Sequence, residues 1–397
     1  MAANLVFVDG TLTTGLNDGT SWENAYQGAT GLQTALDNVS YAVGTHTYIL
    51  LRNTFTLTTR IDVDAWTGSM YYNTWLRIIG CQSGDTGTNY TPLPIGQYVE
   101  IDASGVATDA IRWYTIGECV SFENLWVHGA NTSGYAGFYG DGYTASKYYY
   151  VFKNVKVTDC YHAFRLGSTN TDRVYAVHFF DCVFMNLISH VWRNDCLSYI
   201  QHMSNCYVEI PARCAFWYPT VTEGRYYGVS TMLNNVFSGG MYVFYLTRTP
   251  GRTVANNVFY NQTDIPFYVV HIAGMSAHVN FYNNIAWLAD PARPVIKLAP
   301  DDDGGAVIHC DYNATNSTNA NKWGVYTPWA GDNNIQLSSD PFTDAANGDF
   351  GVNSPALLRG GRPDYMANAG QIGAVQRKYQ FPNLARMANL GRLSIVK

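Results

Sequence analysis

The sequence carries little charge and no long apolar run. Charged residues make up 14% of the 397 residues and hydrophobic residues 47%, a balance that argues against an intrinsically disordered chain. No apolar segment approaches the roughly 18 residues that a transmembrane helix needs, so we expect no insertion into a membrane. The formal net charge is −6, and nucleic-acid binding needs clustered Lys and Arg, so we expect no nucleic-acid partner.

Targeting and metal-binding signals are also missing from the sequence. The segment Met1–Val8 has neither a basic region nor a long apolar core, so we expect no secretory signal here. Either such a signal has been removed, or the protein is made and assembled in a cytoplasm. None of the eight cysteines forms a C-x-x-C pair. This spacing favours reduced, buried thiols over disulfides or a zinc site, and we expect no metal and no cofactor.

A degenerate four-residue pattern recurs through the middle of the chain. Its copies begin at Phe122, Phe152, Phe180, Ser204, Leu233, Ala255, Tyr282 and, more weakly, Cys310. The steps between copies are 30, 28, 24, 29, 22, 27 and 28 residues. A wandering period in the twenties is typical of one coil of a solenoid with variable loops, whereas propeller blades need about 40 residues or more.

The four columns of this pattern differ in chemistry. The first is mostly aromatic or aliphatic, the second is polar, and the fourth is mostly branched aliphatic. This order breaks strict strand alternation, so we expect the chain to turn a corner at the third column, where Asn tolerates a left-handed backbone. Stacked side chains there can form a ladder from coil to coil. The predicted ladder residues are Asn124, Asn154, Cys182, Cys206, Asn235, Asn257 and Asn284.

The runs between these corners are rich in Val, Phe, Tyr and Trp, which favours short strands. We therefore predict an all-β fold, a single-stranded parallel β-helix, with an antiparallel β-sandwich as the alternative. Apolar residues at helical spacing predict a short capping helix over Gly31–Val39, with Thr30 as its N-cap. The run Thr47–Leu51 reads as the first strand.

Both ends of the pattern carry a family resemblance. The segments Phe7–Gly10, Asn17–Trp22 and Leu32–Asp37, together with Asp340–Phe342 and Asn347–Phe350, resemble the ends of pectate-lyase-like right-handed β-helix proteins. The resemblance implies the right-handed fold, but the superfamily includes lyases, hydrolases, adhesins and phage tail proteins. It predicts a cap over residues 1–42, coils over 43–335 and a closing segment over 336–376. Residues 377–397 depart from the family pattern, and we expect them to form a tail.

Motifs for sugar cleavage are incomplete. Polygalacturonase-like enzymes would show N-T-D, D-D, G-H-G and R-I-K strands in order. Here Asn170-Thr171-Asp172 stands alone, and the late run Asp301-Asp302-Asp303 lies beside glycines. That acidic run could bind calcium, but a solvated turn is the simpler interpretation. The histidines are dispersed, and no G-x-S-x-G motif is present. The catalytic residues therefore stay unassigned.

Two features point to partners. The chain has 30 Tyr and 10 Trp, residues that suit sugar stacking and protein interfaces, although outward Tyr can also stabilise strands. The candidate aromatics are Tyr148, Tyr149, Tyr150, Trp217, Tyr218, Tyr226 and Tyr227. The tail is basic and apolar, so it could bind a partner or fold back on its own coils. Its candidate residues are Arg377, Lys378, Arg386, Arg392 and Lys397.

Three functions stay open at this point. We favour a structural or attachment protein of a virus particle, of a bacteriophage by resemblance, on the capsid or the tail. It would be made in the host cytoplasm, assemble as a homotrimer with other virion proteins, and could bind a surface polysaccharide. The alternatives are a polysaccharide lyase or glycoside hydrolase, and a secreted, extracellular adhesin.

Overall fold

The structure is a computed structural model. It describes residues 3–39, 44–63, 74–114, 119–141, 149–166, 173–194, 197–210, 214–217, 228–247, 252–270, 277–298, 306–323, 333–352, 357, 378–380 and 394–396. The chain forms two compact units, Met1–Tyr199 and Ile200–Lys397, which we call unit 1 and unit 2. The boundary falls inside strand β16 (Leu197–Ser204).

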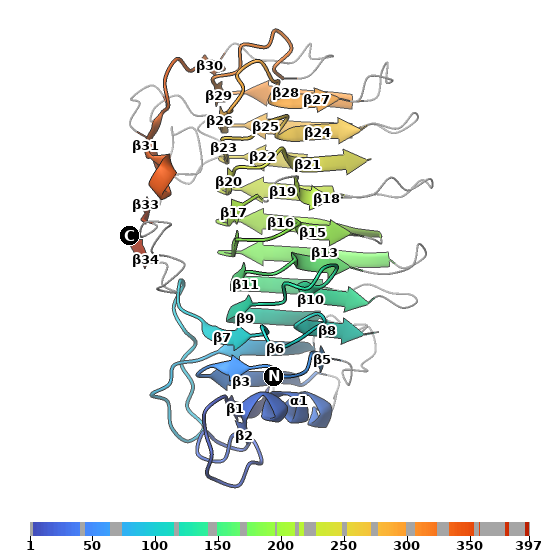
Figure 1. The fold of residues 1–397 in the computed structure, drawn as a ribbon, viewed down its shortest axis with the longest axis vertical. Helices are drawn as coiled ribbons and strands as arrows, with labels where there is room; N and C mark the ends of the chain where they lie inside the picture. The colour runs from blue at the N-terminus through green and yellow to red at the C-terminus, as the bar shows by residue number, and fades with distance from the viewer. Residues whose placement is uncertain are drawn as a thin grey trace. The chain divides into compact units, whose positions relative to one another are not determined.

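Unit 1 is built from three columns of parallel strands (Figure 1). The first column pairs β1 (Ala3–Asp9), β3 (His46–Arg52), β6 (Trp75–Gly80), β9 (Cys119–His128), β11 (Tyr149–Thr158) and β13 (Arg173–Phe180). The second pairs β4 (Phe55–Thr56), β7 (Val99–Asp102), the later halves of β9 and β11, and β14 (Val183–Met185). The third pairs β5 (Ile61–Val63), β8 (Ile111–Tyr114), β10 (Ala136–Asp141), β12 (His162–Leu166) and β15 (His190–Asn194).

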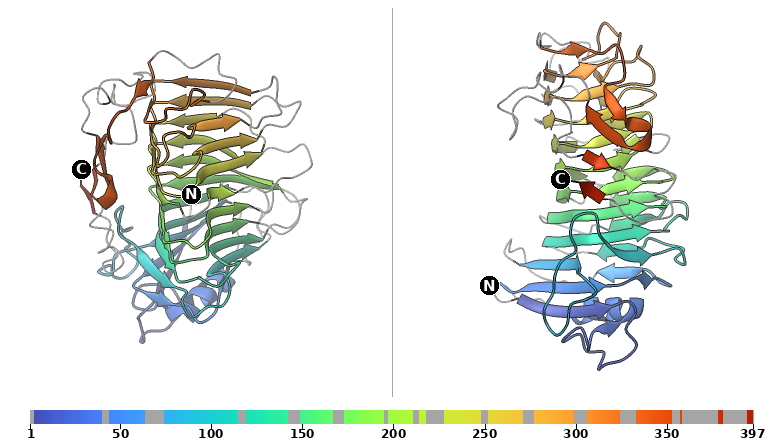
Figure 2. Two further views of the ribbon diagram at one scale, coloured as in Figure 1. Left: turned by 45° about the horizontal axis from the view of Figure 1, so that its top comes forward. Right: turned by 90° about the vertical axis from the view of Figure 1, so that its left-hand side faces the viewer.

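Unit 2 repeats this arrangement (Figure 2). Its first column pairs β19 (Gly228–Leu233), β22 (Arg252–Ala255), β25 (Ala277–Tyr282) and β28 (Ala306–Asp311). The second pairs β17 (Tyr207–Glu209), β20 (Val236–Ser238), β23 (Val258–Tyr260), β26 (Ile285–Trp287), β29 (Ala314–Thr315) and β30 (Ile335–Gln336). The third pairs β18 (Cys214–Trp217), β21 (Tyr242–Thr247), β24 (Phe267–Val270) and β27 (Ile296–Leu298). Both units therefore have the coils of a right-handed parallel β-helix, and the predicted fold class is confirmed.

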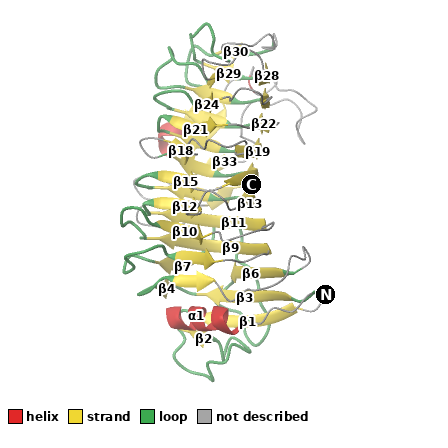
Figure 3. Ribbon diagram, turned by 90° about the vertical axis from the view of Figure 1, so that its right-hand side faces the viewer, coloured by secondary structure: helices red, strands yellow, loops and turns green. Residues whose placement is uncertain are grey.

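A helix covers the first coil of unit 1. Helix α1 spans Gly28–Asn38 and buries Leu32, Ala35 and Leu36, beside β1 and the short strand β2 (Tyr26–Gln27) (Figure 3). The capping helix is confirmed, but its predicted N-cap is wrong: Gln27 holds that position, without a side-chain hydrogen bond. The expected first strand is also third in order, because β1 and β2 precede β3. No helix among the described residues is long and apolar enough to cross a bilayer.

The closing segment of unit 2 folds back onto its second column. It consists of β31 (Phe342–Asp344), a short 3-10 helix η1 (Ala345–Asn347) and β32 (Asp349–Val352), with β31 and β32 antiparallel. The ring of Phe350 lies 5.4 Å from Tyr260 and 6.4 Å from Tyr207. Further on, β33 (Lys378–Gln380) pairs antiparallel with β34 (Ser394–Val396).

Equivalent aromatic side chains stack inside each unit. In unit 1 the ring of Phe152 lies 5.3 Å from both Phe122 and Phe179. In unit 2 the rings of Phe237 and Phe259 are 5.6 Å apart. Parallel strands repeat at about 4.8 Å, so the same residue type in successive coils is brought into stacking distance. These stacks form the buried interior of the coils.

An asparagine ladder runs along one corner of unit 2. Asn257 donates from Nδ2 to Oδ1 of Asn284 at 3.0 Å, and Asn284 makes the same bond to Asn313 at 3.0 Å. Asn235 precedes them with a 3.0 Å bond to Asn257. The ladder ends at Asn334, which accepts from Asn313 at 3.1 Å. Because the amides of Asn235, Asn257, Asn284 and Asn313 are fully buried, these bonds satisfy groups that water cannot reach.

The predicted position of the left-handed residue is wrong for most corners. Asn124 and Asn154 do have positive φ angles of 59° and 51°. In the later copies, however, the left-handed residue stands one place earlier, at Asp181, Asn205, Asn234, Asn256 and Asn283. The third-column residues Cys182, Cys206, Asn235, Asn257 and Asn284 are instead buried. The second column thus supplies the turn, and the third fills the corner from inside.

The repeat register explains part of this difference. Phe152 is the strand partner of Phe179, not of Phe180. Asn154 therefore corresponds to Asp181, one residue before the aligned Cys182. The same slip affects the last copy, since Tyr282 pairs with Asp311. A one-residue slip exchanges the inner and outer faces of a strand, so Asn313, and not Tyr312, continues the ladder.

Seven cysteines lie in the described residues, and all are buried thiols outside any disulfide. Cys196 lies outside the described residues. Burial raises the pKa of both Cys81 and Cys160 to about 12. The buried, reduced state expected from the sequence is thus what the structure has at these seven positions. The predicted adjacency of Cys182 and Cys206 joins residues of different units and stays a prediction.

Candidate functional site

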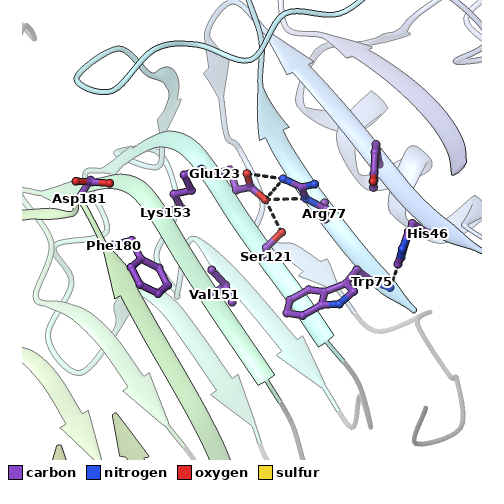
Figure 4. A pocket seen from close by; sticks show the side chains of 10 residues that line it. His46, Trp75, Arg77, Ser121, Glu123, Val151, Lys153, Phe180 and Asp181 are labelled. Atoms are coloured by element: carbon purple, nitrogen blue, oxygen red, sulfur yellow. Dashed lines mark hydrogen bonds and ion pairs between the residues drawn. The ribbon is translucent and has the colours of Figure 1, made fainter. Parts of the chain in front are cut away.

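The outer face of the first column of unit 1 is hollowed into a groove of about 520 Å³. Five consecutive strands, β3, β6, β9, β11 and β13, send side chains into it (Figure 4). Strand alternation produces this lining, because Thr47, Leu76 and Phe122 turn inward and are buried. The lining residues are His46, Tyr48, Trp75, Arg77, Ser121, Glu123, Val151, Lys153, Phe180 and Asp181.

An ion pair stands at the centre of this groove. Arg77 donates from Nε to Oε1 of Glu123 at 2.8 Å and from Nη2 to Oε2 at 2.7 Å. Ser121 donates from its hydroxyl to Oε1 of the same carboxylate at 2.8 Å. The hydrogen bond to Glu123 raises the pKa of Arg77. Two parallel bonds fix the guanidinium plane, so the pair offers a rigid polar surface.

Aromatic rings flank this pair. The guanidinium carbon of Arg77 lies 5.1 Å from the ring centre of Tyr48. Tyr48 stacks on His46 with centroids 6.3 Å apart and planes 15° apart. The backbone N–H of Trp75 donates to Nδ1 of His46 at 3.2 Å. Since Nδ1 accepts, the neutral His46 ring carries its proton on Nε2.

The loop over residues 82–98 packs on Tyr48, one of the groove residues. The ring of Tyr90 meets Tyr48 edge to face at 6.4 Å. The buried corner residue Asn154 anchors this loop by accepting from the backbone N–H of Gly96 at 2.9 Å and donating to the carbonyl of Gln97 at 3.1 Å. Asn154 also donates to Oδ1 of Asn124 at 2.9 Å. The corner amides of unit 1 therefore hold the loop that packs on Tyr48.

The groove combines flat rings with fixed hydrogen-bonding groups. Such a combination binds the apolar face and hydroxyl edges of a sugar. A sugar hydrolase needs two carboxyl groups across the scissile bond. Here both oxygens of Glu123 already accept hydrogen bonds from Arg77 and Ser121. The arrangement suits holding a ligand better than protonating one.

A second polar cluster lies on the second column of unit 1. His128 Nε2 is 2.9 Å from Glu100 Oε1, and its Nδ1 is 3.8 Å from Asp102 Oδ1. The centres of the His128 and Trp126 rings lie 4.6 Å apart. Lys156 Nζ lies 4.0 Å from the ring centre of Trp126. Burial lowers the pKa of Lys156. These groups bind one another, and no set of three or more His, Cys, Asp or Glu among the described residues is arranged to hold a metal ion.

The structure separates the aromatic residues singled out from the sequence. Tyr150 is buried and lies 5.1 Å from Trp113, so its prediction as an interface aromatic is wrong. Tyr149 and Trp217 lie in strands β11 and β18, and nothing further is described of their side chains. Tyr148, Tyr218, Tyr226 and Tyr227 lie outside the described residues.

The other predicted residues fall in different places. Asn124 and Asn154 bind each other, and Asn154 holds the loop over residues 82–98. Asn235, Asn257 and Asn284 form the ladder of unit 2. Lys378 begins β33. Arg377, Arg386, Arg392, Lys397 and the acidic motifs Asn170–Asp172 and Asp301–Asp303 lie outside the described residues.

Sequence reasoning missed two kinds of functional residue. The groove residues on β3 and β6 precede the first copy of the repeat, and only their alternation with buried Thr47, Ile49 and Leu76 marks them. Asn334 was also missed, although Asn333-Asn334-Ile335 repeats the N-N-aliphatic pattern of Asn283-Asn284-Ile285. A search for that tripeptide alone would have found it.

Comparison with solved structures gives a likeness of fold. No family model and no curated protein matches this sequence. Among solved structures, the crystal structure of pectate lyase Pel9A is similar to this chain, with 13% sequence identity and a TM-score of 0.47. The match covers 94% of this chain and 96% of that chain. The parallel β-helix fold of this chain is shown by its own strand pairing.

Proposed function

We propose that this protein is an attachment protein that holds a saccharide chain in the groove of unit 1 without cleaving it. The observation that carries this proposal is the groove itself, in which Tyr48 and Trp75 lie beside the doubly hydrogen-bonded pair of Arg77 and Glu123. Ring faces bind the C–H face of a sugar, and a fixed ion pair orients its hydroxyls.

The rigidity of the groove supports a role in ligand binding. Its floor consists of paired strands, and its central ion pair has two hydrogen bonds. The loop over residues 82–98, which packs on Tyr48, is tied to Asn154. A preformed site loses little conformational entropy when a ligand binds. A flexible sugar chain therefore gains affinity from a surface that does not need to be ordered first.

A polysaccharide lyase or hydrolase is the second candidate. The groove contains two carboxylates, Glu123 and Asp181, which is the composition that sugar cleavage requires. Against it stands the engagement of Glu123 by Arg77 and Ser121. Product formation decides between the two candidates.

The biological setting that we propose is a bacteriophage particle. The resemblance of the chain ends to pectate-lyase-like β-helix proteins, a superfamily that includes phage tail proteins, supports it at the level of the fold. In this setting the protein would be made in the host cytoplasm and would assemble as a homotrimer with other virion proteins. An extracellular adhesin is the alternative setting, and the same groove would serve it.

Binding and cleavage are tested together on a panel of surface polysaccharides. Wild-type protein should retain at least one saccharide, and Trp75→Ala and Arg77→Ala should weaken this binding at least tenfold. The matched control is Tyr268→Ala, which removes a half-exposed ring from β24 of unit 2. No unsaturated product and no new reducing end should form. Cleavage that is lost in Glu123→Gln or Asp181→Asn would instead establish the enzyme.

A further inference from the structure

The outward face of the second column is apolar in unit 2. One row of its residues alternates with Phe237 and Phe259, which point inward and stack on each other. The row therefore faces outward, yet none of its members is more than 3% exposed. An outward apolar row of this kind is stable only when another segment covers it. The row, which we call the apolar row, consists of Tyr207, Val236, Val258 and Ile285.

The closing segment, residues 342–352, lies on this face. The ring of Phe350 lies 6.4 Å from Tyr207 and 5.4 Å from Tyr260. The ring of Phe342 lies 5.7 Å from Tyr260. Both phenylalanines are buried. Ring contacts thus hold the closing segment on the coils, and their strength comes from removing apolar surface from water.

The backbone of the closing segment is self-contained. Strands β31 and β32 pair with each other, and Thr343 donates from its hydroxyl to the carbonyl of Gly351 at 3.0 Å. Asn347 donates from Nδ2 to Oδ2 of Asp344 at 2.7 Å. Between described residues, no backbone hydrogen bond joins this segment to the coils. The segment can therefore leave its place without breaking a strand ladder.

A short hinge connects the closing segment to the last coil. Before the hinge, the N–H of Leu337 donates to the carbonyl of Thr315 at 2.8 Å and fixes the chain to the coils. The first three hinge residues are exposed, and the proline that ends the hinge has no N–H to donate. Four extended residues span about 13 Å, so the segment can swing outward while the coil stays folded. The hinge consists of Ser338, Ser339, Asp340 and Pro341.

We propose that copies of this chain associate by exchanging their closing segments, so that residues 342–352 of one copy cover the apolar row of the next. The seated segment already shows the fit, because the same two surfaces meet in the exchanged state. An open segment leaves the apolar row and its own phenylalanines in water, and the segment of a second copy restores this burial. The closed and exchanged states then differ chiefly in the hinge and in the entropy of association.

The tail favours exchange over closure. Strand β33 lies near β32, so an exchanged segment brings the start of the tail to the next copy. Residues 377–397 are basic and contain no Asp or Glu, whereas the whole chain has a net charge of −6. Passing each segment to the next copy is a heterologous contact, which closes into a ring and is compatible with a homotrimer. The inference uses no groove residue, so its failure would leave the proposed saccharide binding standing.

The length of the hinge tests the exchange. The native mass of the wild-type protein should exceed that of one chain and should rise with concentration. Inserting Gly-Ser-Gly-Ser after Ser338 lets the segment return to its own coils, so it should raise the dissociation constant of the oligomer by about tenfold or more. The same insertion after Gly84, an exposed loop residue of unit 1, is the matched control and should associate like wild type. Native mass spectrometry and sedimentation velocity measure these masses.

Two damaged variants distinguish exchange from other modes of association. Phe350→Glu damages the closing segment and leaves the receiving face intact, whereas Tyr260→Glu damages that face and leaves the segment intact. Each variant alone should be monomeric. Their equimolar mixture should form a one-to-one complex, because the intact segment of one seats on the intact face of the other. Circular dichroism shows whether each variant is folded.

Two results would overturn the proposal. The first is a wild-type protein that stays monomeric at every concentration. The second is an oligomer that the hinge insertion leaves unchanged. If both Glu variants are folded, a mixture that stays monomeric overturns it as well, and the segment then closes on its own coils. If either Glu variant is unfolded, the hinge insertion decides alone.

Discussion

Asn257 and Asn284 are joined by two hydrogen bonds to a single oxygen. Oδ1 of Asn284 accepts from the backbone N–H of Asn257 at 2.9 Å and from its Nδ2 at 3.0 Å. Nδ2 of Asn257 also donates to the carbonyl of Met232 at 3.1 Å. Each amide thus links three levels of the corner, and all of these groups are buried. The ladder therefore stabilises the fold, and a single substitution can test its contribution.

Replacing Asn257 with Val should lower the free energy of unfolding by about 1–3 kcal/mol, because buried partners lose their hydrogen bonds. Urea denaturation of the purified protein measures this change. A midpoint equal to that of wild type would contradict the ladder's role. The structure makes Asn256 the matched control, since it carries the left-handed backbone with φ 58°. Asn256→Gly should be nearly neutral, whereas Asn256→Val should cost about 1 kcal/mol or more in strain.

The corners show how far the sequence predicts this fold. Recurrence of apolar, polar, Asn and aliphatic positions was enough to identify coils, because each coil must bury the same face. It could not distinguish which of two consecutive polar residues turns the chain. Asn adopts a left-handed conformation and also fills a buried corner, so Asn234-Asn235 and Asn256-Asn257 satisfy either assignment. Only the strand register separates the two roles.

The groove was harder to predict for a different reason. Its residues come from five strands spread between His46 and Asp181, and loops of variable length separate those strands. Alternation indicates that Arg77 and Glu123 each face outward, but only the register brings them together. Glu123, Lys153 and Asp181, which all belong to the polar second column of the repeat, line one groove, and Glu123 binds Arg77.

The buried thiols should resist modification in the folded protein. Burial raises the pKa of Cys81 and Cys160 to about 12, so almost no reactive thiolate is present at pH 8. A thiol reagent should therefore label these residues slowly in native buffer and rapidly in denaturant. Peptide mapping by mass spectrometry identifies the labelled sites. Fast native labelling of Cys81, or a disulfide in unreduced protein, would contradict the prediction.

Acid should destabilise unit 1 through His162. Burial, together with the neighbouring His190, Arg193 and Arg165, lowers the pKa of this histidine to about 3. The unfolded chain takes up the proton near pH 6.5, so stability is fully present above that pH and is lost as the pH falls toward 3. The loss should be about 1 kcal/mol per pH unit across the middle of this window.

The variant His162→Phe tests the source of this acid sensitivity. Among the described residues, neither ring nitrogen of His162 has a hydrogen-bond partner, so the substitution removes no described bond. Its unfolding midpoint in urea should fall less than that of wild type between pH 7 and pH 5. A His162→Phe variant as acid-sensitive as wild type would place the sensitivity elsewhere.

The tail over residues 377–397 should serve association and not folding. The closing segment has contacts of its own, since Phe350 packs on Tyr260 and Tyr207. Removing the tail should therefore leave the unfolding midpoint within about 0.5 kcal/mol of wild type, as for other surface changes. It should reduce the native mass from a trimer toward a monomer, and it should weaken attachment to the particle. Light scattering and native mass spectrometry measure the first of these effects.

The competing role of the tail is packing against its own unit. Strand β33 lies near β32, and its pairing with β34 makes a small antiparallel hairpin, so the tail could simply cover the closing segment. The two roles differ in which variant has an effect. Arg386→Gln/Arg392→Gln keeps the apolar residues but removes two charges, so it should weaken association with an acidic partner surface and leave folding unchanged. If the truncated protein loses stability but keeps the native mass and particle binding of the full chain, the tail packs on its own unit and the proposed role in association is wrong.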